Sequence, residues 1–262
     1  MSVLTDWLSS VPLITDGAWG TELQKHGLPI GQISDEWNLT HPERVEQVAR
    51  SYVDAGSKII LTNTFQANSI RLSSRVVEVN QAGVEISKRA ARGKARVFGS
   101  MGPANGNAAA FKEQAHAIAN AGVEALVIET MTGLEEALIA LAAAKRTGLP
   151  VIVSFAFVTD LQPAEAATAM EREGADAVGA NCSGVEECVE LCLALRSACG
   201  LPIWIKPSAG VPKMHEGQPL YTQNLNQFAS VLLNSEASFL GGCCGTTPAF
   251  IRALIEARSA FA

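Results

Sequence analysis

The sequence lacks the features that mark several large classes of protein. Its 20 Lys and Arg residues form no run of four or more, and 26 Asp and Glu residues leave a net charge of −6. A nucleic-acid surface or an anchor for anionic membranes is therefore not indicated. No apolar run approaches the length of about 20 residues that spans a bilayer. These absences favour a soluble enzyme.

The chain also shows no secretory signal and no disulfide framework. Residues 1–14 include Asp6 and no basic residue, whereas a signal peptide begins with a positively charged segment. We therefore expect a cytoplasmic protein. Thiols are kept reduced in the cytoplasm, so the six cysteines are interpreted as core residues, nucleophiles or metal ligands.

Eight apolar segments rich in Val, Ile and Phe alternate with amphipathic segments along the chain. The apolar segments are predicted strands, at 11–17, 57–65, 95–103, 124–131, 150–158, 175–183, 201–210 and 237–244. The amphipathic segments are predicted helices, at 42–56, 76–93, 111–122, 134–148, 163–174, 185–200, 224–236 and 248–260. Several helices end in a glycine that is expected to close them in the left-handed conformation, namely Gly56, Gly93, Gly122, Gly148, Gly174 and Gly200.

The hydrophobicity of the strands predicts how they are arranged. It is continuous instead of alternating, which indicates a parallel sheet buried on both faces. Eight strand-helix units are predicted to close a (β/α)8 TIM barrel, an α/β fold of about 250 residues. A doubly wound open sheet is the alternative, but no GxGxxG turn follows the first strand. We expect a single domain over 1–262, with a long first connection at 18–40 and no folate or cobalamin domain.

Three cysteines stand at the ends of predicted strands, where barrels of this type place their chemistry. Cys182 lies at the end of the sixth predicted strand, and Cys243 and Cys244 lie at the end of the eighth. Alternate strands contribute side chains to the same layer, so the three thiols are predicted to converge at the barrel mouth. Adjacent residues of a regular strand point to opposite faces, so the pair can share a metal only if the strand breaks. The neighbouring glycines permit that break, at Gly241, Gly242 and Gly245.

Thiolate ligands indicate the kind of metal. Three sulfurs with a vacant fourth position are typical of a catalytic zinc site. On spacing alone, a pair of unreactive thiols or a vicinal disulfide at Cys243 and Cys244 stays open as an alternative. The other three cysteines, on or at the end of the sixth helix, are interpreted as small buried hydrophobes; they are Cys188, Cys192 and Cys199.

Seven segments, taken in order and spacing, resemble the homocysteine S-methyltransferase family. They are TDGAWGTELQ (15–24), EWNLTHPE (36–43), YVDAGSKIILTNTFQAN (52–68), VIETM (127–131), GANCS (179–183), KPSAGVP (206–212) and GGCCGTTPAFI (241–251). The resemblance covers nearly the whole chain. It implies a (β/α)8 barrel, Zn2+ held by Cys182, Cys243 and Cys244, and homocysteine as the methyl acceptor.

The chemistry of three thiolates agrees with that implication. Three thiolates donate so much charge that zinc becomes a poor Lewis acid for activating water, which argues against a hydrolase. A substrate thiol would instead bind as thiolate and be a nucleophile at neutral pH. Attack on a methyl group is a single in-line displacement that needs alignment of the reactants and no general base.

The amino-acid end of homocysteine needs partners of its own. Glu129, at the end of the fourth strand, suits the ammonium group, and the resemblance assigns the matching glutamate that task. The resemblance also implies that Asp16 contacts the substrate. The carboxylate is expected to meet backbone N–H groups around Gly17 and Ala18, in a turn of a kind that binds anions. Asn181 is expected to hold the loop or the ligand. A salt bridge for Glu129 and an Asx turn for Asp16 stay open as alternatives.

The methyl donor is the least determined part of the resemblance. Trp19 and Ser208 depart from the family pattern, and the loops after the fifth and sixth predicted strands, which are expected to form the rim, are short. Gln66 stands where betaine-dependent members resemble one another in having an aromatic residue, which disfavours betaine. A sulfonium such as S-methylmethionine is one donor, and Trp19, Trp37 or Phe65 could face its charge. A methylated corrinoid on a separate protein is the other.

Two classes of function therefore stand. One is a zinc-dependent methyltransferase that makes methionine from homocysteine, or that methylates another small thiol or selenol. The other is a non-catalytic or split-enzyme module that binds homocysteine or zinc and presents its ligand to a separate corrinoid protein. Neither nucleic acid nor a membrane is expected as a partner.

Overall fold

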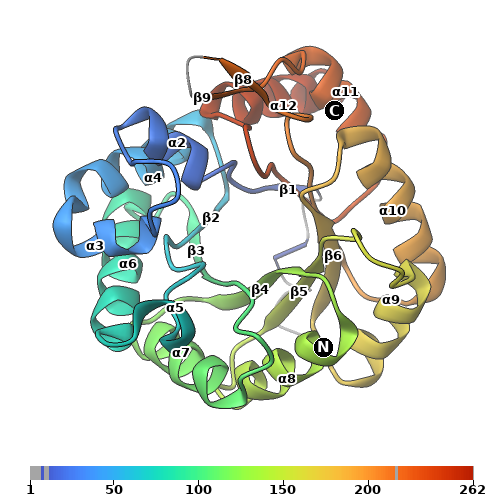
Figure 1. The fold of residues 1–262 in the computed structure, drawn as a ribbon. Helices are drawn as coiled ribbons and strands as arrows, with labels where there is room; N and C mark the ends of the chain where they lie inside the picture. Colours follow the sequence, from blue (N-terminus) through green and yellow to red (C-terminus); the bar gives the residue numbers. More distant parts are fainter. Residues whose placement is uncertain (1–6, 9–11, 216–217, 262) are drawn as a thin grey trace.

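The computed structural model describes residues 7–8, 12–215 and 218–261. It contains an eight-stranded parallel sheet in the order β1-β10-β7-β6-β5-β4-β3-β2, surrounded by helices (Figure 1). The N–H of Lys58, just before β2, donates to the carbonyl of Ile14 in β1 at 2.8 Å, so the two ends of this series meet. The predicted (β/α)8 barrel is confirmed. The expectation that residues 1–14 are not a secretory signal stays a prediction, because residues 1–6 and 9–11, with Asp6 among them, lie outside the described residues.

Every predicted strand contains an observed barrel strand. The strands are almost entirely buried, because one face lines the barrel interior and the other lies under the helices. Their bounds are β1 Leu13–Ile14, β2 Ile59–Leu61, β3 Arg96–Met101, β4 Ala125–Met131, β5 Val151–Phe155, β6 Ala177–Asn181, β7 Ile203–Lys206 and β10 Phe239–Leu240.

The eight predicted helices are also present. Their bounds are α4 Pro42–Ala55, α6 Val76–Ala91, α7 Ala108–Asn120, α8 Leu134–Lys145, α9 Pro163–Arg172, α10 Val185–Ala198, α11 Leu225–Leu233 and α12 Pro248–Phe261. Five of the six closing glycines have the expected positive φ, namely Gly56, Gly93, Gly122, Gly148 and Gly174. The prediction for Gly200 was wrong, because α10 ends in an extended Cys199 with φ −150° and Gly200 is not left-handed.

Several short elements were not predicted. The first connection is not only a loop, since it holds α2 (Gly20–Lys25), the 3-10 helix η2 (Ser34–Glu36) and α3 (Trp37–Thr40). A further short helix, α5 (Ser69–Leu72), follows β2, and a hairpin of β8 (Lys213–His215) and β9 (Gln218–Leu220) follows β7. Elements of three to six residues carry too little periodicity to be read from a sequence.

An aromatic layer fills the interior of the barrel. The Trp204 ring lies 6.4 Å from Phe98 and 5.3 Å from Phe239, centroid to centroid, and all three side chains are fully buried. The barrel is thus a packed core at the level of its strands, and open space lies at their carboxyl ends. Among the described residues, every helix is too short or too polar to cross a bilayer.

Candidate metal centre and substrate pocket

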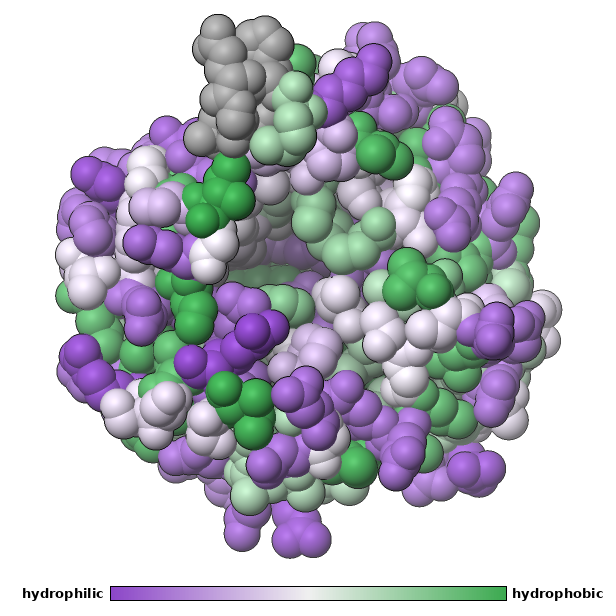
Figure 2. Space-filling view, in the orientation of Figure 1, coloured by the Kyte–Doolittle hydropathy of each residue, from purple (hydrophilic) through white to green (hydrophobic). Residues whose placement is uncertain are grey.

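A cavity of about 400 Å³ lies at the carboxyl ends of the strands. In the space-filling view it is the hollow in the middle of the face (Figure 2). The first connection and the ends of β2, β3, β4, β6, β7 and β10 contribute its walls. Most of its lining is apolar, which is typical of a small-molecule site that uses a few polar groups for specificity.

Three cysteines converge on this cavity. The sulfur atoms of Cys182, Cys243 and Cys244 all lie within 4.8 Å of one another, and all three residues line the cavity. The Cys182 and Cys243 sulfurs are 2.9 Å apart, and those of Cys243 and Cys244 are 4.0 Å apart. The predicted convergence of thiols from the sixth and eighth barrel strands is confirmed. Cys188 and Cys192 are buried in the core, as predicted, whereas Cys199 is only partly buried against it.

The break that brings the adjacent cysteines together follows β10. This strand ends at Leu240, and the N–H of Cys243 then donates to the carbonyl of Pro207 at 2.7 Å. Gly245 has φ +79°, and a Cβ atom there would lie 2.3 Å from the Tyr221 ring. Only glycine therefore fits this turn without strain or displacement of the ring.

Cys182 has an unusual backbone that its neighbours hold in place. Its φ is 70°, and Thr130, across the site, has φ 64°. The Asn181 side chain bridges the two, because its Nδ2 donates to Thr130 Oγ1 at 2.8 Å and to Cys182 Sγ at 3.3 Å. Its Oδ1 accepts from Thr130 N and from Ser154 Oγ. Left-handed non-glycine residues persist where surrounding contacts determine them, often at functional sites.

The thiols are protonated at neutral pH without a metal. The hydrogen bond with Cys182, followed by burial, raises the pKa of Cys243. For Cys182 itself the Cys243 thiol lowers the pKa, but Cys244 and burial outweigh it and raise the pKa to about 12. Metal binding would release these protons. Tetrahedral zinc with Zn–S bonds of about 2.3 Å needs sulfurs about 3.8 Å apart, and the observed separations lie on both sides of that value. The donor set therefore fits zinc after changes of about 1 Å or less in the sulfur separations.

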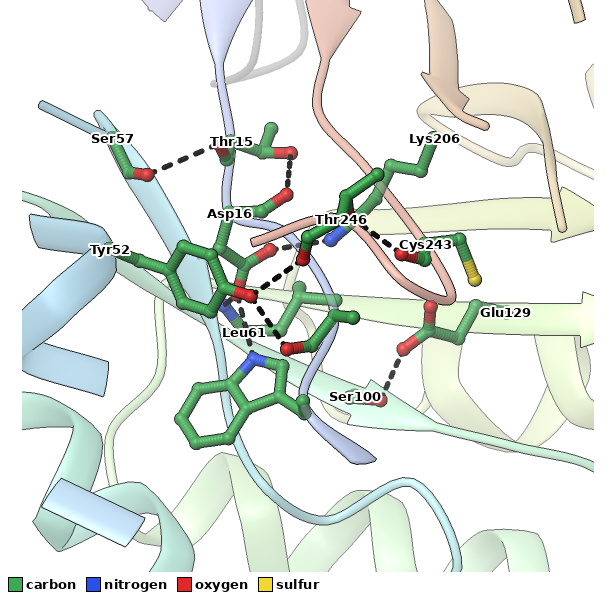
Figure 3. A network of polar contacts seen from close by, with 12 residues as sticks. Thr15, Asp16, Tyr52, Ser57, Leu61, Ser100, Glu129, Lys206, Cys243 and Thr246 are labelled. Atoms are coloured by element: carbon green, nitrogen blue, oxygen red, sulfur yellow. Dashed lines mark hydrogen bonds and ion pairs between the residues drawn. The ribbon is translucent and has the colours of Figure 1, made fainter. Parts of the chain in front are cut away.

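A buried ion pair of Lys206 and Asp16 lies near Cys243 (Figure 3). Lys206 Nζ donates to Asp16 Oδ1 at 2.5 Å, and the two side chains are 3% and 0% exposed. The other oxygen of Asp16 accepts from the N–H of Leu61 at 2.7 Å and from Trp19 Nε1 at 2.8 Å. Asp16 thereby links the ends of β1, β2 and β7, and it lies behind the residues that line the cavity.

Glu129 faces the cavity from the end of β4. Its Oε1 accepts from Ser100 Oγ at 2.5 Å, and its other oxygen has no hydrogen-bond partner among the described residues. Burial raises the pKa of Glu129, while Lys206 and Ser100 oppose that shift. A buried carboxylate with one free oxygen is suited to an ammonium group.

The other residues predicted at the site fall into three groups. Gly17 and Ala18 line the cavity, but the N–H of Ala18 donates to the carbonyl of Thr246 at 3.0 Å. Among the aromatic residues proposed to face a cation, Trp19 and Phe65 line the cavity. Trp37 does not, because it is buried beside the His41 ring with Arg44 over its face.

Lys206 is the main polar residue of the cavity to which the sequence analysis assigned no role. A sequence signal for it exists, since a charged residue closes the otherwise apolar segment IWIK. A fully buried lysine at the carboxyl end of a barrel strand needs a partner and marks a polar site. The fold and the site together define a (β/α)8 barrel with a three-cysteine group able to hold a metal ion.

The chain belongs to the homocysteine S-methyltransferase family, a family of enzymes, because the sequence model of that family matches residues 13–258. Methionine synthase of Mycobacterium tuberculosis is 30% identical over 97% of this chain and 25% of that protein. The S-methylmethionine-homocysteine S-methyltransferase BHMT2 of Pongo abelii is 27% identical over 93% of this chain and 77% of that protein. The chain spans about a quarter of the length of the curated methionine synthases it matches.

A solved structure shares the fold. The homocysteine methyltransferase MmuM from Escherichia coli, in its metallated form, has a TM-score of 0.81 to this structure at 22% identity. The match covers 97% of this chain and 99% of the MmuM chain. It extends over the barrel strands and helices alike, which agrees with the predicted fold.

Proposed function

We propose that this protein is a zinc-dependent S-methyltransferase that converts homocysteine to methionine. The observation that carries the proposal is the convergence of the Cys182, Cys243 and Cys244 sulfurs within 4.8 Å in the wall of a cavity that also contains Glu129. A thiol-rich metal site favours binding of a further sulfur, and a carboxylate beside it favours a thiol that carries an ammonium group.

Zinc held by these three cysteines would keep the substrate sulfur as a thiolate, the nucleophilic form, at neutral pH. The chain's own residues supply the alignment. The free oxygen of Glu129 accepts from the substrate ammonium, and Gly17 and Ala18 form a wall with little side-chain bulk. Asp16 and Asn181 act from behind the cavity, by bracing the strand ends and by holding Cys182. Positioning of this kind is the main requirement of an in-line displacement.

The methyl donor that we propose is a small sulfonium of the S-methylmethionine type. Trp19 and Phe65 line the cavity, and aromatic rings attract cations over their faces. The similarity to BHMT2, whose name includes S-methylmethionine, is consistent with this choice.

A methylcorrinoid on a separate protein is the second candidate donor. The 30% identity to a methionine synthase favours it. Because the cavity is only about 400 Å³, a corrin ring would have to present its methyl group from outside the mouth. A protein that only binds homocysteine would have the same cysteine site but form no methionine with any donor. A protein that methylates another thiol or selenol would also have this site but would turn over that acceptor instead of homocysteine.

Zinc X-ray absorption of the reduced protein, before and after addition of homocysteine, tests the proposal. We expect three sulfurs and one lighter atom to become four sulfurs, and a Cys199→Ala variant to behave identically because Cys199 is not in the site. An unchanged sulfur count would refute thiolate binding. A donor panel then separates the candidates, because S-methylmethionine should support methionine formation without any added protein, whereas the corrinoid route requires a methylated corrinoid protein.

A further inference from the structure

A second cavity lies at the opposite end of the barrel from the cysteines. Its volume is about 540 Å³, and its walls come from residues at the amino ends of β1, β2, β3 and β4 and from the last turn of α12. We call it the basal cavity, and its lining includes Trp7, Lys58, Lys94, Arg96, Glu124 and Arg258. It shares none of its described lining residues with the cavity of the cysteines.

The lining of the basal cavity is cationic. Among the described residues that line it, four are lysine or arginine and one, Glu124, is acidic. The whole chain has the opposite balance, with 20 Lys and Arg against 26 Asp and Glu. A hollow lined by one sign of charge focuses the electric field and raises the local concentration of counter-ions. The lining therefore favours an anion.

Aromatic and charged contacts hold the floor of the basal cavity in place. The Trp7 ring lies 5.5 Å from the ring of Phe98, centroid to centroid, and Phe98 belongs to the aromatic layer of the barrel. The Arg96 guanidinium lies 4.2 Å from the centroid of the Trp7 ring. Arg96 also pairs with Glu124, and each of these two side chains is 40% exposed. The carboxylate of Glu124 is thus neutralised within the protein.

Lys58 and Lys94 supply positive charge that the protein does not use. Both side chains are exposed, and neither ammonium group has a hydrogen-bond or ion-pair partner among the described residues. Their backbone is nevertheless fixed at the ends of strands, because the N–H of Lys58 donates to Ile14 at 2.8 Å and the N–H of Arg96 donates to Lys58 at 2.9 Å. Ammonium groups beside a held guanidinium are suited to phosphate oxygens.

We propose that the basal cavity binds a compact anion with two or more negative charges, such as inorganic phosphate or the phosphoryl group of a small metabolite. Lys58 and Lys94 hold its oxygens, and Arg96 adds positive charge at the floor. Such a ligand stabilises the folded chain, because the unfolded chain does not assemble these groups. This inference goes beyond the proposed function and does not depend on methyl transfer.

The competing role for the two lysines is that of ordinary solvated surface charges. The double variant Lys58→Gln/Lys94→Gln separates the two roles, and it should fold because neither ammonium group has a partner among the described residues. The matched control is Lys112→Gln/Lys213→Gln, which changes the net charge by the same amount. Those two lysines are exposed and lie toward the carboxyl ends of the strands, in the first half of α7 and in β8.

Isothermal titration of the reduced, zinc-loaded protein measures the binding. The probes are inorganic phosphate, pyrophosphate and ribose 5-phosphate, with chloride used to keep the ionic strength constant. We expect one anion per chain, with pyrophosphate bound more tightly than phosphate. The double variant should lose about 10-fold in affinity, about threefold for each exposed charge pair, and the control should stay within about twofold of the parent. Lys94→Glu should lose more than Lys94→Gln, whereas Lys94→Arg should retain the affinity.

The outcomes also identify the source of the anion. Equal affinities for phosphate and ribose 5-phosphate would support the free ion as the ligand, and tighter binding of ribose 5-phosphate would support a phosphoryl group on a larger molecule. The absence of saturable binding for all three probes would overturn the inference. So would binding that the Lys58→Gln/Lys94→Gln variant retains in full, or an equal loss in this variant and the control, because either result places the anion elsewhere on the protein.

Discussion

Replacing Asp35 with asparagine should stabilise the protein at neutral pH and have little effect in mild acid. Asp35 lies in η2, within the first connection, and its side chain is 0% exposed. Its Oδ1 accepts from the N–H of Gln66 at 2.8 Å, and its Oδ2 accepts from Ser34 Oγ at 3.0 Å. Because Gln66 and Ser34 both line the cavity, this carboxyl group supports the wall of the site from within the protein.

The magnitude follows from the pKa of Asp35. Burial raises it from 3.8 to about 6, against the opposing effect of the hydrogen bonds from Gln66 and Ser34. Between these pH values the folded chain keeps a proton that the unfolded chain has released, so the free energy of unfolding falls as the pH rises through this window. The total loss is about 3 kcal/mol, of which about 2 kcal/mol falls between about pH 4.5 and pH 7. Asparagine cannot ionise and escapes this loss, while its amide can still accept from Gln66.

Urea unfolding followed by circular dichroism, at about pH 4.5 and about pH 7, measures the effect. The stability of the Asp35→Asn variant relative to the parent should rise by about 2 kcal/mol between the two pH values, with unchanged m values. Other titrating groups cancel in this comparison. Asp54→Asn, at an exposed position on α4, is the matched control, because it makes the same substitution without burial. A stability difference for Asp35→Asn that stays constant with pH would refute the reasoning.

Three further predictions concern the metal centre. Cys243→Ala should lose stoichiometric zinc. Its zinc affinity should be lower by about a hundredfold or more if each of four ligands contributes about a quarter of a binding free energy of about 10–16 kcal/mol. Competition with a chelator measures the zinc affinity, and the Cys199→Ala control should match the parent. Asn181→Ala should weaken zinc binding about 10- to 100-fold, because the side chain that positions Cys182 is lost, and an unchanged zinc affinity would contradict that role. In urea unfolding, Gly245→Ala should destabilise the protein more than Gly148→Ala does. The two glycines have similar φ angles of +79° and +77°, but of the two only Gly245 would place its new Cβ atom against an aromatic ring. Equal losses of unfolding free energy would show that the ring moves aside.

Much of the barrel could be predicted because its strands and helices have local causes. Strands buried on both faces must be continuously apolar, and helices on the outside must be amphipathic, so each of the eight units is visible in its own segment. The convergence of Cys182 with Cys243 and Cys244 follows from strand parity in a closed barrel, and the position of Glu129 at a strand end follows from the same geometry. Predicting these features requires only the order of the strands and helices along the chain and the hydrophobic periodicity of each segment.

The features that could not be predicted are pairs of residues that closure of the barrel brings together. Lys206 and Asp16 are 190 residues apart, and a sequence pattern that marks both as buried does not say that each is the other's partner. The same is true of Asn181 beside Thr130, of Trp37 packed away from the cavity, and of the hairpin of β8 and β9. The barrel and the convergence of the three cysteines could be predicted because hydrophobic period and strand parity are properties of the chain, and the family could be predicted because its motifs are present in the sequence. The charge arrangement of the pocket was decided by the tertiary structure, because a buried charge takes its partner from whichever strand end lies within hydrogen-bonding distance.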